Sequence, residues 1–530
     1  MGELKARLAD TTTRAEKLTR LDSETWDVLI VGGGISGAGV LREAARRGWR
    51  AALIEQRDFA WGTSSRSSKL VHGGLRYLKS GQFGLTLHSV QERDKLMAEA
   101  PELVEAQSFL FANCKGRKPG RRMFMLGLKI YDRMAKGRHR SAYHTLNATS
   151  LLAPGIAPAR LIGGTTYIDA KTDDARLVWR VLAEANKDDG MALNYVAARS
   201  PIFTGDKKIC GLNVEDVETG ARYAIKAGAV INATGAWADG LRGAVHGKPM
   251  VRPLRGSHLV IPFWRLPVAQ AISLMHPQDG RPVFFYPWEG VTLVGTTDLD
   301  HAGDMHNEAS ITAEEVTYLL AAVNDQFPGL AINANDIAAT FAGVRPVIDD
   351  GSGDPSSAGR DHVVLDEAGM ITLTGGKLTT FRLMAQDALA LAAPHIGKNF
   401  TADDMAIFSP AVAMNPRWPA GVRHRLAARY GSAAAELAQA ASDDDFDTVP
   451  GTTTLWIELA IAAKYEAIVH LDDLLLRRTR LGILLPRGGL DYLGRIRELS
   501  QSALAWNEEK WQAEITRYRS IIATHYGLPT

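Results

Sequence analysis

Three glycines and one glutamate near the start of the chain have the spacing of a dinucleotide-binding turn. Gly32, Gly34 and Gly37 follow the apolar run 27–31, and Glu55 closes a second apolar run. In such a unit the first glycine makes a tight turn, the second lets the backbone approach a pyrophosphate, and the third lets helix and strand pack closely. The acid accepts hydrogen bonds from a ribose diol. The alternative is a glycine turn without a ligand, which the ordered strand, turn, helix, strand and acid disfavour.

Two later segments indicate a flavin rather than a nicotinamide nucleotide. The apolar run 229–232 leads into the small-residue turn 233–235, and the run 370–374 leads into Gly375, Gly376 and a helical pattern. Three separated segments that converge on one nucleotide fit an interrupted flavin domain. A helix N-terminus beside the flavin would stabilise its reduced, anionic ring. Because the chain holds one full GxGxxG, we expect electrons to come directly from the substrate.

The stretch 61–77 is rich in hydroxyl side chains. Such side chains supply small donors for phosphate groups and ring atoms. The alternative is a polar surface loop. The hydroxyl residues are Thr63, Ser64, Ser65, Ser67 and Ser68.

The composition limits the class of protein. The chain has 530 residues, a formal net charge of +2 and 46% hydrophobic residues, which excludes a wholly disordered or fibrous chain. The charge gives no reason to expect a nucleic-acid partner. Two cysteines are too few for a disulfide framework or a Cys₄ metal site, and we expect no metal. Residues 1–24 do not read as a secretory signal and no run reads as a membrane span, so we expect a soluble or peripheral protein facing the cytoplasm.

The order of these patterns predicts a mixed α/β (α+β) architecture with a flavin domain that is interrupted by a second sheet. We expect antiparallel strands to roof the substrate and a helical cap to serve packing and oligomer contact. The predicted divisions are an N-terminal extension at 1–23, a flavin-binding domain at 24–395 (about 24–100, 160–255 and 335–395), a sheet insert at about 256–334, and a C-terminal helical cap at 400–530.

One segment, 115–140, is sharply biased toward basic residues. It holds ten lysines and arginines and one acid, Asp132, around the apolar stretch 123–131. A basic amphipathic helix of this kind can lie in the plane of an anionic membrane. The alternative is a charged helix packed on the protein's own surface.

Seven motifs in one order resemble the FAD-dependent glycerol-3-phosphate dehydrogenase family, the respiratory type that passes electrons to quinone. They are VGGGISGAGV, TSSRSSKLVHGGLRYL, NATGAW, RGSHLVIP, VGTTD, GVRP and GGKLTT. The likeness runs from about 26 to 391 and continues in the cap at 472–481.

The resemblance implies a Rossmann-like FAD-binding domain of the glutathione-reductase/D-amino-acid-oxidase type with noncovalent FAD. It implies oxidation of sn-glycerol 3-phosphate to dihydroxyacetone phosphate by hydride transfer from C2 to flavin N5, with electrons passed to a membrane quinone. It also implies a homodimer attached peripherally to the cytoplasmic face of the inner (plasma) membrane, where the segment 115–140 would contact anionic lipid.

A phosphate dianion needs fixed cations, and the planar fork of arginine suits it best. By resemblance, Arg345, Lys377 and Arg76 with Tyr77 line the substrate pocket, and Arg360 joins them. Arg345 lies in an apolar, proline-flanked context that suits a surface charge poorly. Arg360 follows a loop rich in glycine, serine and aspartate, so a surface charge is the alternative there.

Removal of a hydride from the C2 carbinol requires loss of the hydroxyl proton, and a neutral histidine near its ordinary pKa suits that task. The resemblance favours His258 as the base, with Arg345 and Lys377 able to polarise the oxygen. His72 is the alternative site of covalent flavin attachment. The residues expected at the cofactor are Gly32, Gly34, Gly37, Glu55, Thr63, Ser64, Ser65, Ser68, Lys69, Leu70, His72, Gly73, Gly74, Thr234, Gly235, Gly375, Gly376, Lys377, Leu378 and Thr379.

Three other functions compete with this interpretation. An amine or amino-acid oxidase of the same fold would bind a carboxylate and need only one arginine. A glycerol-3-phosphate oxidase would share the reductive half-reaction and use oxygen. A non-catalytic flavin protein that anchors partners at the membrane would have no use for Arg345, Lys377 and His258.

Overall fold

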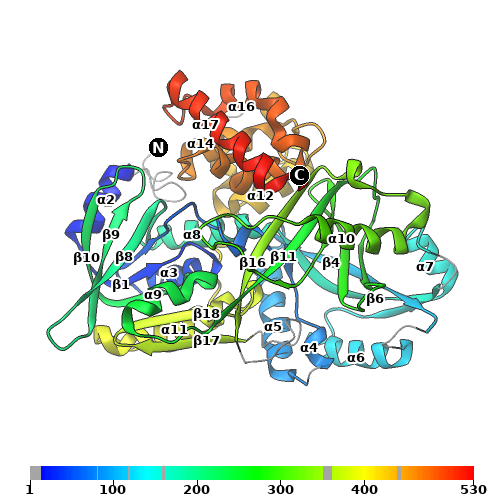
Figure 1. Ribbon diagram of the computed structural model, residues 1–530, viewed down its shortest axis with the longest axis horizontal. Helices are drawn as coiled ribbons and strands as arrows, with labels where there is room; N and C mark the ends of the chain where they lie inside the picture. Colours follow the sequence, from blue (N-terminus) through cyan, green and yellow to red (C-terminus); the bar gives the residue numbers. More distant parts are fainter. Residues whose placement is uncertain are drawn as a thin grey trace.

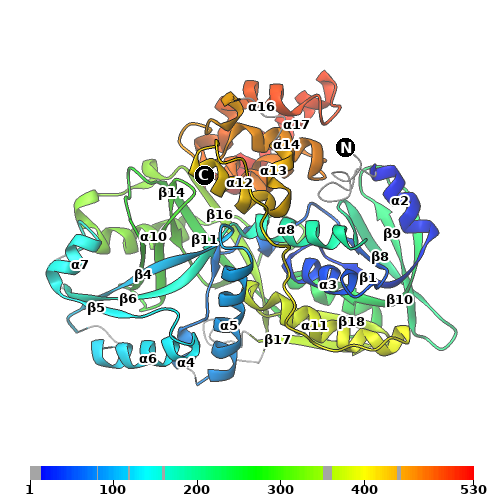
Figure 2. The ribbon, with the colours of Figure 1, turned by 180° about the vertical axis from the view of Figure 1, so that it is seen from behind.

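The computed structural model describes residues 13–79, 81–116, 120–157, 161–349, 361–438 and 443–529. Two sheets stand side by side, and the C-terminal helices lie across the junction between them (Figures 1 and 2). The predicted mixed α/β fold with a helical C-terminal domain is confirmed.

The first sheet is the nucleotide-binding one. Its order is β17-β18-β10-β1-β2-β7, and β8 and β9 extend from β10. The five strands from β18 to β7 are parallel, and β1 is buried on both faces, as its unbroken apolar sequence predicts. The strands are β1 (Thr25–Val31), β2 (Ala51–Ile54), β7 (Met191–Leu193), β8 (Val196–Phe203), β9 (Ile209–Asp216), β10 (Arg222–Asn232), β17 (His362–Glu367) and β18 (Met370–Gly375).

Helices cover both faces of this sheet. The helices α3 (Ile35–Ala45), α8 (Asp174–Lys187) and α11 (Phe381–Ala392) bury their apolar sides in one core with β1. On the other face, α2 (Arg14–Ser23) packs with β9 and β10 through Leu18 and Leu21, so part of the predicted N-terminal extension belongs to this core.

The second sheet is larger than the predicted insert at 256–334. Its order is β15-β11-β14-β13-β12-β4-β6-β3, with β16 beside β11 and β5 beside β6. It is antiparallel except between β12 and β4. The strands are β3 (Leu70–Val71), β4 (Val104–Cys114), β5 (Ala142–His144), β6 (Leu161–Thr172), β11 (Val251–Pro262), β12 (Ala271–Met275), β13 (Pro282–Trp288), β14 (Val291–Gly295), β15 (Leu299–Asp300) and β16 (Ala339–Ile348).

This sheet is covered differently on its two faces. The helix α10 (Ala313–Gln326) packs Leu319 and Val323 against one face. The other face bears Phe341 and Tyr286, which share a core with apolar residues of the C-terminal domain. The helices α4 (Arg76–Lys79), α5 (Phe83–Glu99) and α6 (Arg121–Met134) lie at the lower end of the sheet in Figure 1, and α7 (Leu146–Leu152) lies beside β5 and β6.

The C-terminal domain is helical, as predicted. Its longer helices are α12 (Ala420–Tyr430), α14 (Trp456–Tyr465), α16 (Leu493–Ser500) and α17 (Glu508–Ile521). His470 ties it to the first sheet, because its ring nitrogens lie 2.8 Å from Glu514 Oε1 and 3.2 Å from Glu218 Oε1. Burial acts to lower the pKa of His470, but the hydrogen bonds to Glu218 and Glu514 outweigh it and raise the pKa to about 9.

Candidate active site

The glycine turn at the carboxyl end of β1 has the geometry that its sequence predicts. Gly32 has φ +111°, and a Cβ there would lie 2.6 Å from the Ala233 carbonyl oxygen. A Cβ on Gly37 would collide with the Gly32 carbonyl oxygen. Beside Gly34, the first turn of α3 donates from Ile35 N to Ser64 Oγ at 3.0 Å. The backbone segments of the turn therefore pack directly against each other. The helix α3 begins at the same turn, and its N-terminus favours anions.

Glu55 closes β2 beside the same turn. Its carboxylate accepts hydrogen bonds from Gly33 N at 2.7 Å and Arg57 N at 2.9 Å. Burial raises the pKa of Glu55 despite these two bonds. The acid is therefore held at the strand end where a ribose diol would lie in a nucleotide site of this type.

The structure brings the three predicted flavin segments to one edge of the sheet. The strands β1, β10 and β18 are adjacent and parallel. The turns after Val31, Asn232 and Thr374 therefore all lie at the carboxyl ends of these strands, along one edge of the sheet. Thr374 Oγ1 donates to the Gly235 carbonyl at 3.0 Å and joins two of the turns. Gly235, Gly375 and Gly376 all have positive φ. The backbone, turned back on itself at three neighbouring strand ends, fits the elongated dinucleotide of FAD.

The serine loop, residues 63–69, runs between the two sheets. Thr63 Oγ1 donates to the Val344 carbonyl, and Ser65 is buried. Ser68 Oγ lies 2.9 Å from His258 Nε2. Lys69 is wholly buried, and burial together with the nearby Arg480 lowers its pKa to about 8. Leu70 follows in β3.

The glycine loop after β3 contacts the third flavin segment. The His72 carbonyl accepts a hydrogen bond from Thr379 Oγ1 at 3.2 Å. Gly73 N donates to Asp169 Oδ1 at 3.0 Å, and Gly74 lies close to Lys377, whose Nζ would be 3.2 Å from a Cβ there. Leu378 and Thr379 lie in a single 3₁₀ turn before α11. In the second segment, Thr234 Oγ1 donates to Asn232 Oδ1 at 2.7 Å.

His258 lies on β11, between β16 and β14 of the second sheet. Its ring stacks on Phe341 of the paired strand β16, with centroids 4.6 Å apart and planes 11° apart. The residue is 1% exposed, and Nδ1 has no hydrogen-bond partner among the residues that the structure describes. A buried polar atom without a partner is costly, so a bound group that hydrogen-bonds to this nitrogen would be favoured.

The pKa of His258 is not the ordinary one on which the sequence argument rested. Burial lowers it well below the usual 6.5, and the charges of Arg345 and Lys69 lower it further. The imidazole is therefore neutral at physiological pH and has a free lone pair to accept a proton. A bound anion would oppose the two cations and make the ring more basic.

Arg345 projects from β16 on the same face of the sheet as His258. It ion-pairs with Asp298 at 2.9 Å and donates to Thr296 Oγ1 at 3.0 Å. A Cβ on Gly256, across the β11–β16 pair, would overlap its guanidinium. The side chain is 23% exposed, so the fork is held in place and still reachable.

Lys377 and Tyr77 form the other charged contact of the predicted pocket. Lys377 Nζ lies 3.8 Å from the centre of the Tyr77 ring and 2.9 Å from Ser89 Oγ. The backbone of Arg76 belongs to α4, but its side chain lies outside the described part of the structure. Arg360 also lies outside the described residues.

Sequence reasoning missed two acids of this site. Asp298, the partner of Arg345, ends the VGTTD motif, so its signal was present in the sequence. Asp174 contacts the serine loop through Ser67 and Lys69, but the sequence around it carries no flavin motif.

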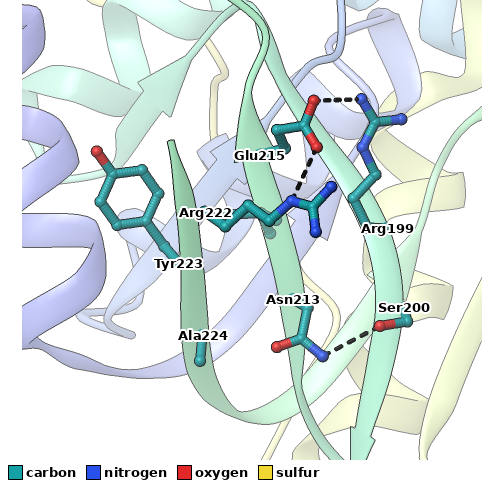
Figure 3. Close-up of a pocket in the computed structure, with 8 residues that line it drawn as sticks. Arg199, Ser200, Asn213, Glu215, Arg222, Tyr223 and Ala224 are labelled. Carbon is teal, nitrogen blue, oxygen red and sulfur yellow. Dashed lines mark hydrogen bonds and ion pairs between the residues drawn. The ribbon is translucent and has the colours of Figure 1, made fainter. Parts of the chain in front are cut away.

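A hollow of about 640 Å³ lies elsewhere, on the antiparallel extension of the first sheet. Figure 3 shows Glu215 between Arg199 and Arg222, with ion pairs of 3.0 and 3.3 Å. Its lining comes from β8, β9 and β10 and includes no residue of the predicted site. Its two arginines are exposed and already paired with Glu215, so the hollow adds nothing to the flavin site.

This fold and site define a flavin-dependent oxidoreductase. Residues 27–382 match the family described as FAD dependent oxidoreductase. Residues 371–511 match the C-terminal domain of alpha-glycerophosphate oxidase.

Individual proteins similar to this chain identify its family among the flavin-dependent oxidoreductases. The aerobic glycerol-3-phosphate dehydrogenase of Staphylococcus aureus (strain MRSA252) is 32% identical and the match covers 96% of each chain. The X-ray structure of glycerol-3-phosphate dehydrogenase from Bacillus halodurans complexed with FAD is 26% identical, with a TM-score of 0.77 and 97% of each chain covered. The chain belongs to the FAD-dependent aerobic glycerol-3-phosphate dehydrogenase family, which confirms the resemblance and the predicted FAD cofactor.

More distant structures share the fold alone. A glycine oxidase from Geobacillus kaustophilus is 23% identical with a TM-score of 0.52, and it covers 73% of this chain. L-alpha-glycerophosphate oxidase from Mycoplasma pneumoniae is 19% identical with a TM-score of 0.56, and it covers 74%.

Proposed function

We propose that this chain oxidises sn-glycerol 3-phosphate to dihydroxyacetone phosphate and passes the electrons to a membrane quinone. The observation that carries the proposal is the pairing of His258, with its unpartnered Nδ1, and Arg345 on one face of the second sheet. Bound FAD supplies the acceptor for the hydride of C2, at N5 of its ring. The relatives named for this substrate, which match the chain over nearly its full length, support the choice of substrate.

The cations select the phosphate. Arg345 supplies a fixed positive charge for the phosphate, because Asp298 and Thr296 hold its guanidinium in one orientation. Lys377, braced by Ser89 and the Tyr77 ring, adds a point charge. An amino-acid oxidase on this fold would have only a carboxylate to bind, for which one arginine suffices.

The proton of the C2 hydroxyl goes to His258. With Nε2–H donating to Ser68 Oγ, the neutral ring presents its lone pair at Nδ1. The imidazolium that forms lies near Arg345 and Lys69, which disfavour it. The phosphate dianion offsets these charges, so proton transfer is easier with substrate bound than without it.

The helix α6 supports attachment to a membrane. Met123, Leu126 and Ile130 are 67%, 55% and 38% exposed, whereas Leu128 and Tyr131 face the protein. Basic residues of the segment 115–140 accompany this apolar face, which suits an anionic bilayer surface. Among the helices that the structure describes, none is long and apolar enough to cross a bilayer. We place the protein on the cytoplasmic face of the inner membrane; the homodimer stays a prediction.

Anaerobic mixing of the purified holoprotein with glycerol 3-phosphate tests the reductive half-reaction. We expect the visible flavin absorbance to bleach, and then to return on addition of a soluble quinone. Bleaching by glycine, sarcosine or a D-amino acid, but not by glycerol 3-phosphate, would favour the amino-acid oxidase instead. Fast return in air, with quinone inert, would favour the oxygen-using oxidase.

Flotation with vesicles of anionic phospholipid tests the membrane proposal. We expect the variant with Met123, Leu126 and Ile130 all changed to serine to stay with the soluble fraction and lose quinone-dependent turnover. Its turnover with a soluble dye acceptor should persist. Serine at Met405 and Val412, which are exposed apolar residues outside α6, is the matched control and should not alter flotation. Equal flotation of both variants would exclude α6 as the attachment surface.

A further inference from the structure

The C-terminal segment 472–481 is buried, and it is unusually rich in charge for such a place. Asp472, Asp473, Arg477, Arg478 and Arg480 are each 2% exposed or less. Buried ion pairs add little net stability compared with apolar packing, because desolvation offsets their attraction. Stability alone therefore does not account for these charges.

Arg480 reaches out of the C-terminal domain to the serine loop. Its Nη2 donates to the Ser65 carbonyl at 2.8 Å and to Asp174 Oδ1 at 3.0 Å. Its Nη1 donates back to the Leu476 carbonyl at 2.9 Å. One guanidinium thus joins three elements: the C-terminal segment, the start of α8 and the loop.

Asp174 holds the centre of the loop from the same side. It accepts hydrogen bonds from Ser67 N at 3.0 Å, from Ser67 Oγ at 2.7 Å and from Lys69 Nζ at 3.1 Å. Lys69 N in turn donates to Ser67 Oγ at 3.0 Å. Lys69 has φ +56°, a conformation that a non-glycine residue keeps only when its surroundings impose it.

Ser68 stands between these anchors and touches the candidate base. Its hydroxyl lies 2.9 Å from His258 Nε2, and its carbonyl accepts the hydroxyl of Tyr286. The anchoring by Arg480 and Asp174 on one side therefore determines where Ser68 meets the imidazole on the other.

We propose that Arg480 is a positioning residue, which fixes the Ser68 hydroxyl against His258 Nε2 through the serine loop. The inference rests on the proposed function, because it takes His258 as the base. It gives the C-terminal domain a part in proton transfer, beyond the packing role that the sequence predicts. Ser68 Oγ, as the acceptor of the hydrogen bond from His258 Nε2–H, favours the tautomer that leaves the lone pair at Nδ1.

The test compares Arg480→Lys with Arg176→Lys. Arg176 is equally buried at the same boundary between domains, but its hydrogen bonds go to Glu466 and the Arg478 carbonyl. Lysine keeps the charge at both positions and removes the fork, so the chain should still fold. The readouts are the rate constant of anaerobic flavin reduction at saturating glycerol 3-phosphate, the substrate dissociation constant, and amide hydrogen exchange of peptides covering 65–71.

We expect Arg480→Lys to slow flavin reduction about tenfold or more, because a small misplacement of a reacting group costs that much. The substrate dissociation constant should change less than about threefold, and exchange of the loop amides should accelerate. Arg176→Lys should lower the melting temperature comparably, with flavin reduction and loop exchange within about twofold of the parent.

A second variant keeps the proposal testable if Arg480→Lys is too unstable to purify. Ser68→Ala should slow flavin reduction to a similar degree with no loss of melting temperature. Where all variants fold, the effects of Ser68→Ala and Arg480→Lys should be less than additive, because both act through one contact.

Equal reduction rates in Arg480→Lys and the parent would overturn the inference, as would equal slowing by Arg176→Lys. Unaltered reduction in Ser68→Ala would overturn it too. A parent protein that glycerol 3-phosphate does not reduce would instead overturn the proposed function, so the two failures are distinct.

Discussion

Replacement of Arg345 by alanine probes the phosphate-binding assignment most directly. The substitution removes a guanidinium that is 23% exposed and leaves its partner, Asp298, 12% exposed without its 2.9 Å ion pair. Two effects follow. The phosphate loses a charge-assisted contact, and it meets the Asp298 carboxylate without the Arg345 charge that pairs with it. The flavin segments lie on the other sheet, so bound flavin should be unaffected.

The two effects can be given magnitudes. A charge-assisted hydrogen-bonded contact is worth about 2–3 kcal/mol, which is roughly 30- to 150-fold in the substrate dissociation constant. Repulsion between Asp298 and the phosphate adds about 1–2 kcal/mol at an effective dielectric constant of about 20. The double variant Arg345→Ala/Asp298→Asn should therefore bind the substrate roughly five- to 30-fold more tightly than Arg345→Ala alone.

Stopped-flow flavin reduction over a range of glycerol 3-phosphate concentrations measures these dissociation constants. Arg265→Ala is the control, because Arg265 is 26% exposed and pairs at 2.6 Å with Asp336, in the turns that follow β11 and precede β16. We expect the control to match the parent within about twofold. If Arg345→Ala binds substrate as the control does, Arg345 does not hold the phosphate. If the double variant binds substrate no more tightly than Arg345→Ala alone, Asp298 does not repel the phosphate.

Three further outcomes are expected. His258→Gln should slow flavin reduction about 10²- to 10⁴-fold. Because burial lowers the pKa of His258, kcat/KM of the parent protein, corrected for phosphate ionisation, should stay level from about pH 8 to 6. A decline in kcat/KM centred near pH 6.5 would contradict this. His470→Asn should lower the free energy of unfolding by about 2–3 kcal/mol below pH 6.5, and this loss should vanish as the pH rises through about 9. The reason is that the raised pKa of His470 in the folded state reflects stabilisation of its protonated form only. Urea unfolding at several pH values measures the loss, and a loss that grows above pH 9 would contradict the prediction. Tyr131→Phe should lower stability by about 1–2 kcal/mol through loss of its 2.6 Å bond to Asp169, whereas Tyr143→Phe, at an exposed residue, should not.

Much of the fold follows from local patterns. The βαβ unit with Gly32 and Glu55 was predictable because each part is specified by neighbours in sequence: an apolar strand, a turn that tolerates only glycine, and a helix. The second sheet was predicted too small. Its strands β4 and β6 come from 104–114 and 161–172, far from the insert in sequence, and no local signal shows that they pair with each other and extend the sheet through β12.

The class of chemistry is readable from the residues alone, because the glycine spacings, hydroxyls and cations needed for a flavin and a phosphate lie in short contiguous motifs. The electrostatics of the site, in contrast, depend on which residues the fold brings together. The low pKa of His258 arises from burial against Phe341 and from Arg345, which is 87 positions away (345 − 258) and becomes its neighbour only through the register of β11 and β16. The contact of Arg480 with the serine loop likewise joins residues about 400 positions apart. Charges act through space, so their effect on a proton can be known only when the chain has folded.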